Sequence, residues 1–242
     1  MRTVYFFFVI VTISMTACSG SANSSEHPSL VRFADSLFQT NVDSAYIAGA
    51  SVIVYQNGEK LLDKTYGYAN LELAVPMPEN PSFEIGSVTK QFTSAAILRL
   101  VEEGKLSLDD DFSQYLDYDT KGRSITINRL LNHTSGIASY TELPEFGDIF
   151  TQSLERDTLL RIVEQHDFLF EPGEALIYNN SAYFFLGLII EEITGMSYEE
   201  YLREQFFTPL GMNNTYYSSN SEVILNKADG YDYRGTVSYT HL

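Results

Sequence analysis

The sequence predicts an α+β fold, in which an antiparallel sheet is flanked by helices and joined to a mostly helical lobe. Apolar side chains recur at helical spacing near the start, at Leu30, Phe33, Leu37 and Phe38. Two strand-like runs then enclose Asn57-Gly58, a pair typical of a tight β-hairpin turn. Beyond residue 83 the apolar pattern is mainly helical. A lone two-stranded hairpin is only marginally stable, so we expect further strands to join this sheet.

Prolines and glycines divide the helical part. Three prolines within 76–81 mark an irregular crossing, and the long apolar helix that follows ends at a glycine. A second apolar helix, expected over 182–194, also ends before a glycine. Ser197 and Glu200 have the spacing of a capping box, which predicts a last amphipathic helix through Phe207.

The N-terminal residues resemble a bacterial export signal. The apolar run from Val4 to Met15 is too short to span a bilayer and fits the central region of a secretory signal. Met-Thr-Ala-Cys at 15–18 resembles a lipobox, in which Cys18 receives a lipid after cleavage; an ordinary signal peptide cut nearby is the alternative. We expect 1–17 to be removed and 18–28 to form a flexible tether. The protein would then leave the bacterial cytoplasm as a membrane-anchored lipoprotein facing the periplasm or the cell exterior.

Composition limits the classes of partner. The 242 residues carry a formal net charge of -17, and an acidic surface repels the phosphates of nucleic acids. One cysteine allows no internal disulfide. The four histidines are scattered without a zinc-binding pattern, so we expect no metal and no cofactor. The length suffices for one sizeable domain, or for two interleaved lobes that share a core, and we place this domain at 29–235.

Ser87 and Lys90 have Ser-x-x-Lys spacing at the start of the long apolar helix. Gly86 allows a sharp turn, and residues three apart on a first helical turn point the same way. The helix has almost no polar face, so we expect it to cross the middle of the protein and to strip water from Lys90, which favours a neutral base. Its N-terminus would stabilise an oxyanion. The alternative is a serine N-cap followed by a solvent-facing lysine.

Tyr178 and Asn180 are the candidates for the rest of the site. They follow a Pro-Gly turn and precede an apolar helix, as loop residues projecting into a cleft would. The other Tyr-x-Asn triplets, at 55–57 and 68–70, lie in the expected hairpin turn and at a strand end, where a structural role is simplest. A tyrosine beside a cation can act as acid or base, and an asparagine amide can bind a substrate carbonyl and brace a lysine.

Four blocks of the sequence resemble, in order and spacing, the serine β-lactamase-related family of class C β-lactamases, D-alanyl-D-alanine carboxypeptidases and related esterases and peptidases. They contain FEIGSVTK from Phe83, ITINRLLNHTSG from Ile125, EPGEALIYNN from Glu171 and FFTPLGMNN from Phe206. The resemblance covers roughly 48–215 and implies a β-lactamase/transpeptidase-like fold. It also implies that Ser87 is the acylated nucleophile, Lys90 its base, Tyr178 the proton relay and Asn180 the substrate-binding amide.

Two other features of these blocks carry a structural expectation. His133 matches a block that is mainly structural in the family, and we expect a satisfied loop or core histidine rather than a catalyst. The acidic run at 109–111 follows a helix end and indicates a turn and an N-cap on a solvated face. The absence of a Gly-x-Ser-x-Gly sequence weakens the α/β-hydrolase alternative.

The resemblance stops before the third motif of the family. A Lys-Thr-Gly or His-x-Gly on a late strand does not occur, so we expect part of the oxyanion site, the C-terminal strands and the helix that covers them to be missing from this sequence. Residues 236–242, TVSYTHL, match one reading frame of a widely used transposon-end adapter. We expect them to be a non-native tail; a genuine short tail is the alternative.

The sequence therefore predicts an exported serine hydrolase that forms an acyl-enzyme from an amide or ester: a β-lactam, a D-alanyl peptide or a simple ester. Its partners would be a small-molecule or peptide substrate and the membrane, through the lipid, with no nucleic acid and with the oligomeric state open. The alternative from another class is a non-catalytic binding module or an inactive fragment. The sequence leaves open whether the 242 residues alone are active. It also leaves the substrate open, because the residues that line the pocket determine which substrate binds.

Overall fold

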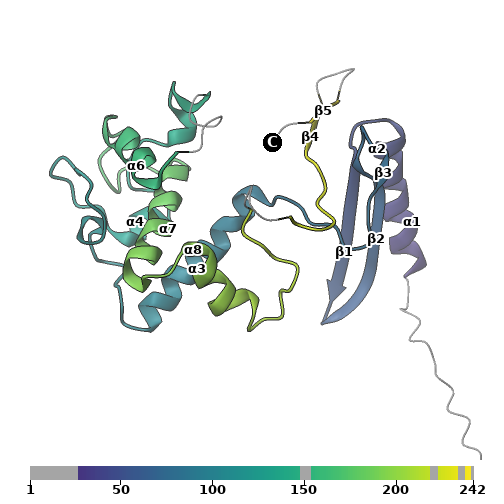
Figure 1. Ribbon diagram of the computed structural model, residues 1–242, viewed down its shortest axis with the longest axis horizontal. Coiled ribbons are helices and arrows are strands. Elements are labelled where there is room, and N and C mark those ends of the chain that lie inside the picture. Colours follow the sequence, from purple (N-terminus) through teal and green to yellow (C-terminus); the bar gives the residue numbers. More distant parts are fainter. Residues whose placement is uncertain (1–26, 148–153, 219–222, 234–237, 241–242) are drawn as a thin grey trace, which may run out of the picture. The chain divides into compact units, whose positions relative to one another are not determined.

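The structure is a computed structural model that describes residues 27–147, 154–218, 223–233 and 238–240 (Figure 1). The expected signal peptide, Cys18 and most of the expected tether lie outside these residues. The chain divides into two compact units, unit 1 with 1–81 and 226–242, and unit 2 with 82–225. Helices and antiparallel strands together give the α+β fold that the sequence predicts. No helix among the described residues is long and apolar enough to cross a membrane.

Unit 1 consists of a helical stretch followed by an antiparallel sheet. The helical stretch runs without a break through α1 (Pro28–Ala34), the π-helix η1 (Asp35–Gln39) and α2 (Thr40–Asp43). The sheet has the strand order β1-β2-β3, with β1 at Gly49–Gln56, β2 at Glu59–Asn70 and β3 at Val75–Pro76. A separate pair follows late in the chain, β4 (Tyr231–Tyr233) with β5 (Ser238–Thr240).

The predicted hairpin turn lies between β1 and β2. Asn57 and Gly58 have φ angles of 52° and 80°, the left-handed values that a tight two-residue turn requires. Gln56 pairs with Glu59 across the turn, and the register then continues to Gly49 opposite Gly67. The hairpin is therefore confirmed, and β3 supplies the further strand that its marginal stability led us to expect.

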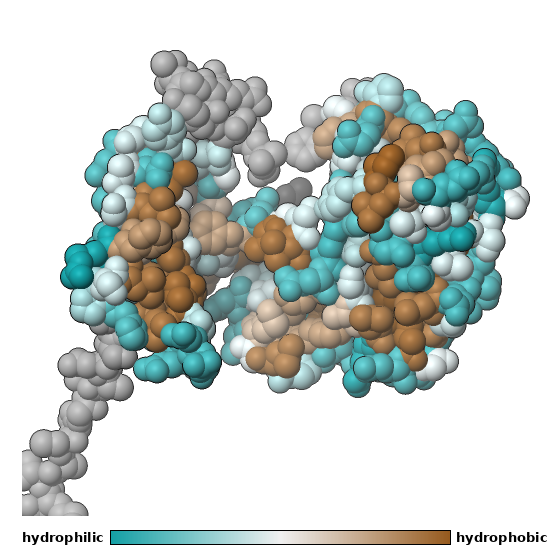
Figure 2. Space-filling view, turned by 180° about the vertical axis from the view of Figure 1, so that it is seen from behind, coloured by the Kyte–Doolittle hydropathy of each residue, from teal (hydrophilic) through white to brown (hydrophobic). Residues whose placement is uncertain are grey.

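The core of unit 1 is small. Ala34, Leu62 and Tyr66 are buried, with half-buried apolar residues of the N-terminal helices and of β1 around them. The rings of Phe38 and Tyr66 stack with centroids 5.5 Å apart. On the other face of β1, Ile53 is 57% exposed, since successive residues of a strand point to opposite faces. Figure 2 shows a continuous band of apolar residues on the surface of this unit, at the left of the view.

Unit 2 is mostly helical. Its longer helices are α3 (Thr89–Glu102), α6 (Arg156–Glu164) and α7 (Asn180–Thr194). The shorter ones are η2 (Gly86–Val88), η3 (Phe112–Gln114), α4 (Ile127–Leu131), η4 (Tyr140–Glu142), α8 (Tyr198–Leu202) and η5 (Arg203–Phe207). All the helices that the sequence predicts in this part are present, and α6 is one that it did not predict.

Helix α7 is the centre of unit 2. It contacts α3, α4, α6 and α8, and its Phe185 is fully buried (Figure 1). The Phe185 ring stacks on Phe112 with centroids 5.9 Å apart. We expected α3 to cross the middle of the protein, but only one face of this helix is buried. Ile97 on that face is fully buried, while Leu98 is 48% exposed. Central position therefore belongs to α7, and α3 packs one face against it.

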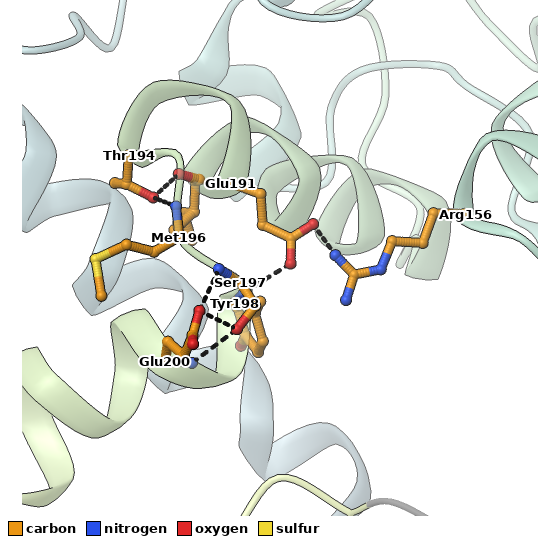
Figure 3. A network of polar contacts seen from close by, with 8 residues as sticks. Arg156, Glu191, Thr194, Met196, Ser197, Tyr198 and Glu200 are labelled. Atoms are coloured by element: carbon orange, nitrogen blue, oxygen red, sulfur yellow. Dashed lines mark hydrogen bonds and ion pairs between the residues drawn. The ribbon is translucent and has the colours of Figure 1, made fainter.

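Local caps close the ends of several helices in unit 2. Ser197 accepts the Glu200 amide while the Glu200 carboxylate accepts from Ser197, so the predicted capping box is confirmed. Glu191 of α7 accepts both the Tyr198 amide and the Arg156 guanidinium (Figure 3). Asp111 caps η3 by accepting the Ser113 amide, as the acidic run predicts. Side chains thus cap the N-terminal ends of several helices in unit 2.

Candidate active site

Ser87 lies in η2, immediately before α3, and is exposed to solvent. Gly86 has a φ of 49°, which a residue without a Cβ adopts easily and which produces the turn into the helix. Val88 occupies the N-cap of α3, and its side chain makes no capping hydrogen bond. The Ser87 hydroxyl is therefore not used as a helix cap, in contrast to the alternative that the sequence left open.

The Ser87 hydroxyl contacts two groups that can exchange protons with it. The Tyr178 phenol donates a hydrogen bond to Ser87 Oγ at 2.7 Å. Lys90 Nζ lies 3.4 Å from the same oxygen and 4.8 Å from the centre of the Tyr178 ring. A nucleophile and two candidate bases are thus within hydrogen-bond reach of one another, which is the geometry that nucleophilic catalysis requires.

Asn180, the first residue of α7, holds Lys90 in place. Its Oδ1 accepts a hydrogen bond from Lys90 Nζ at 2.7 Å. Its Nδ2 donates to Thr141 Oγ1 at 3.0 Å, and its backbone amide donates to Ser139 Oγ at 3.1 Å. Because Thr141 takes the amide NH₂, the carbonyl end of Asn180 must face the lysine. Lys90 is therefore a partnered, half-buried residue and not a solvent-facing one.

The charge of Lys90 affects Tyr178. Partial burial acts to raise the pKa of the Tyr178 phenol, but hydrogen bonds with Lys90 and Ser87 and the positive charge of Lys90 outweigh it. The net result is a pKa below the ordinary value of 10.0. A lowered pKa makes the phenolate more accessible, so this tyrosine is better suited to accept a proton near neutral pH than an ordinary one.

His133 and Asn179 support the loop that carries Tyr178. The Asn179 amide donates to His133 Nδ1 at 3.1 Å. The Asn179 side chain caps α7 by accepting the Ala182 amide at 2.8 Å, and it donates to the carbonyl of Ile137. Asn179 is 3% exposed, so these contacts fix it firmly.

The structure brings together all four residues that the sequence assigns to the site, Ser87, Lys90, Tyr178 and Asn180, and their chemical roles stay predictions. Cys18, the predicted lipidation site, lies outside the described residues. Sequence reasoning missed the contribution of Ser139, Thr141 and Asn179. An asparagine directly before an apolar helix is an N-cap signal that could have identified Asn179, whereas nothing local points to Ser139 or Thr141. No cluster of three or more potential metal ligands occurs among the described residues.

The comparisons with known proteins identify the family of this chain. The sequence profile of the beta-lactamase family matches residues 34–240. Protein flp of Staphylococcus aureus (strain MRSA252) is 32% identical over 207 residues, which is 84% of this chain and 41% of flp. The chain thus spans less than half the length of this relative.

Solved structures show the same fold. EstCE1, described as a hydrolase with promiscuous acyltransferase activity, superposes with a TM-score of 0.78 at 27% identity, over 89% of this chain and 60% of EstCE1. An octameric penicillin-binding protein homologue from Pyrococcus abyssi superposes with a TM-score of 0.76 at 31% identity, over 87% of this chain and 50% of the homologue. Because the family profile covers most of the sequence and these folds agree, the chain belongs to the serine β-lactamase-related family.

Proposed function

We propose that the full-length protein is an exported serine hydrolase that forms an acyl-enzyme at Ser87 from an amide or an ester. The observation that carries the proposal is the 2.7 Å hydrogen bond between the Tyr178 phenol and Ser87 Oγ, beside the ammonium of Lys90. A β-lactam, a D-alanyl peptide and a simple ester all present a carbonyl carbon to such a nucleophile. The described acyltransferase activity of EstCE1 fits this class of chemistry.

In the proposed acylation step, Ser87 Oγ attacks the substrate carbonyl carbon, and its proton passes to Lys90 in its neutral amine form or to Tyr178 in its phenolate form. The tetrahedral intermediate collapses with cleavage of the amide or ester bond, and the departing nitrogen or oxygen takes the proton. The start of α3 is suited to stabilise the oxyanion, because the helix dipole places partial positive charge at this end. Water, activated by the same groups, then hydrolyses the acyl-enzyme and restores Ser87.

Covalent labelling tests the nucleophile directly. The full-length protein is incubated with a fluorescent penicillin or an activated ester, and the labelled residue is identified by peptide mass spectrometry. We expect label on Ser87 and none in Ser87→Ala. Ser82→Ala, which changes another serine five positions earlier, is the matched control and should label normally. Labelling that persists undiminished in Ser87→Ala would exclude this nucleophile, and failure of both probes would favour a non-catalytic binding module.

We further propose that Cys18 anchors the mature protein to the membrane through a lipid. The lipobox-like residues at 15–18 support this proposal. Cells producing the protein would be fed a radioactive fatty acid and separated into membrane and soluble fractions. We expect the label to follow the protein into the membrane fraction and to be lost in Cys18→Ala. Unlabelled protein released from the cell would instead indicate ordinary signal-peptide cleavage.

A further inference from the structure

His133 holds the backbone on both sides of Tyr178. Its carbonyl oxygen accepts the amide of Ile177 at 3.1 Å, and its Nδ1 accepts the amide of Asn179, also at 3.1 Å. Ile177 and Asn179 are the two neighbours of Tyr178 in the chain. A single residue therefore fixes the backbone from which the Tyr178 phenol reaches Ser87.

The imidazole ring also contacts the Tyr178 side chain. Its centre lies 4.7 Å from the centre of the Tyr178 ring and 5.1 Å from that of Tyr183 on α7. The backbone of His133 has a φ of 63°, a left-handed value that is uncommon outside glycine and that asparagine, aspartate and histidine adopt more often than other residues. The position thus combines an unusual backbone with an acceptor that points at one particular amide.

An Nδ1 that accepts a hydrogen bond cannot carry a proton, so His133 is neutral with its hydrogen on Nε2. The titratable groups that face the ring are Lys90 on α3, Tyr178 on the preceding loop and Tyr183 on α7, and Lys90 contributes a positive charge. Burial, followed by the charge of Lys90, lowers the pKa of His133 below the ordinary value of 6.5. Both effects favour the neutral form that the hydrogen bond needs.

We propose that His133 is a positioning residue that holds Tyr178 against Ser87 only while its Nδ1 is unprotonated. Protonation would set an N–H against the N–H of Asn179, break that bond and add a second positive charge near Lys90. The loop at 177–179 would then loosen, and the phenol would leave hydrogen-bond distance of Ser87. This inference rests on the proposed hydrolase function and adds to it a residue that does not itself touch the reacting atoms.

The pH dependence has a defined sign. Because the folded protein lowers the pKa of His133, the contact is complete above the ordinary histidine pKa and is lost as the pH falls through the lowered one. Activity should therefore fall on the acidic side of neutrality. The change should appear in kcat rather than in KM, because the phenol moves protons and does not bind substrate in the proposed mechanism.

Two substitutions at His133 distinguish the effect of its hydrogen-bond acceptor from the effect of its titratable ring. His133→Asn places an amide oxygen near the position of Nδ1, tolerates the left-handed backbone and does not titrate. We expect this variant to keep most of the activity at neutral pH and to lose the acidic decline due to His133. His133→Leu has no acceptor, and we expect kcat to fall about tenfold at every pH with KM nearly unchanged. His166→Asn, at the other histidine of unit 2, is the matched control and should keep the wild-type profile.

The result that overturns the inference is equally clear. If His133→Asn loses activity on the acidic side at the same pH as the wild-type protein, His133 does not set that decline. If His133→Asn is as impaired as a folded His133→Leu, or if His133→Leu is fully active, the acceptor has no positioning role. Circular dichroism and the unfolding midpoint establish which variants are folded before rates are compared.

A measurement without substrate separates this inference from the proposed function. In the ¹⁵N-labelled full-length protein, the amide signal of Asn179 should shift with the titration of the His133 ring, and should not titrate in His133→Asn. If this coupled titration is found but Ser87 labels with neither probe, the proposed function fails and the pH-dependent contact stands. If His133 titrates while the Asn179 signal does not move, the inference fails and the proposed function is unaffected.

Discussion

Unit 1 and unit 2 differ in how completely they bury their apolar residues. Among the described residues, the large side chains that are less than 2% exposed all belong to unit 2, with Phe112 and Phe185 the largest. In unit 1 the buried clusters are small, and β1 leaves Ile53 and Tyr55 more than half exposed. All four candidate site residues lie in unit 2, the unit with the denser core. Dense packing around these residues helps to hold their side chains in fixed positions.

The two units also differ in how their helices begin. In unit 2, side chains of Asn179 and Ser197 cap α7 and α8. In unit 1, α1 begins after His27 without a side-chain cap. Helix α3, which carries Lys90, also begins without a side-chain cap, so a cap matters to the site at α7, where a displaced helix end would displace Asn180 as well.

The largest expected effect concerns the core of unit 2. Phe185→Ala removes a fully buried ring that stacks on Phe112, and we expect the free energy of unfolding to fall by about 3–5 kcal/mol. Urea unfolding followed by circular dichroism measures the change. Ile53→Ala in unit 1 is the matched control and should cost far less, because Ile53 is 57% exposed. Equal losses in the two variants would remove the contrast between the units.

The next effect concerns Thr141, which orients the Asn180 amide. Thr141→Val keeps the shape but removes the acceptor for Asn180 Nδ2, so the amide can turn and Lys90 loses its partner. A hydrogen bond of this kind is worth up to about 1.5 kcal/mol, so we expect the acylation rate of Ser87 to fall by up to roughly tenfold. Stopped-flow labelling measures this rate. Thr141→Ser keeps the hydroxyl and should restore most of it; an unchanged rate in Thr141→Val would show that Asn180 needs no such support.

A smaller effect is expected at the cap of α8. Ser197→Ala removes one half of the capping box, and we expect a loss of about 1 kcal/mol in the free energy of unfolding. His27→Ala is the corresponding change in unit 1, where no side-chain cap exists, and should leave stability unchanged. Thermal unfolding of both variants tests the contrast, which disappears if the two midpoints shift alike.

The smallest expected effect is a change in the stability of the protein at acidic pH. Partial burial acts to raise the pKa of Asp111, but hydrogen bonds from Ser113, from the Ile125 amide and from Ser124 outweigh it, so the pKa lies below the ordinary 3.8. A lowered carboxylate pKa contributes stability above 3.8 that is lost as the pH falls through the lowered value. Unfolding midpoints measured from pH 6 to pH 3 should therefore decline less steeply in Asp111→Asn. An identical slope would assign the acid sensitivity to other carboxylates.

Local signals predicted most of the fold. The Asn57-Gly58 hairpin turn and the Ser197 capping box follow from the conformational preferences of a few neighbouring residues, and both are present. Helix α6 was missed although its apolar residues recur at helical spacing, with Leu160 and Val163 three positions apart and both buried. The burial of α3 was overestimated because its apolar sequence says nothing of which neighbour covers it, and α7 takes the central place instead.

The site was predictable to the extent that it follows motifs. Ser87 and Lys90 belong to one helical turn, so their spacing alone indicates that they can meet. Tyr178 and Asn180 were candidates because they follow a Pro-Gly turn and precede an apolar helix. Only the resemblance to a family implied that they meet Ser87 and Lys90, since residues 90 positions apart have no local reason to be neighbours. Thr141 accepts a hydrogen bond from the Asn180 side chain, and His133 accepts the amides of Ile177 and Asn179. Only the three-dimensional structure shows which atoms these bonds join.

The hydrogen bond between Tyr178 and Ser87 joins residues 91 positions apart in the chain. Contacts of such separation form only after the entropy cost of closing the intervening loop has been met, so they arise late in folding. A nascent or unfolded chain consequently holds a serine of ordinary reactivity. In the proposed mechanism, Ser87 therefore becomes a competent nucleophile only after α7 has docked beside α3 during folding.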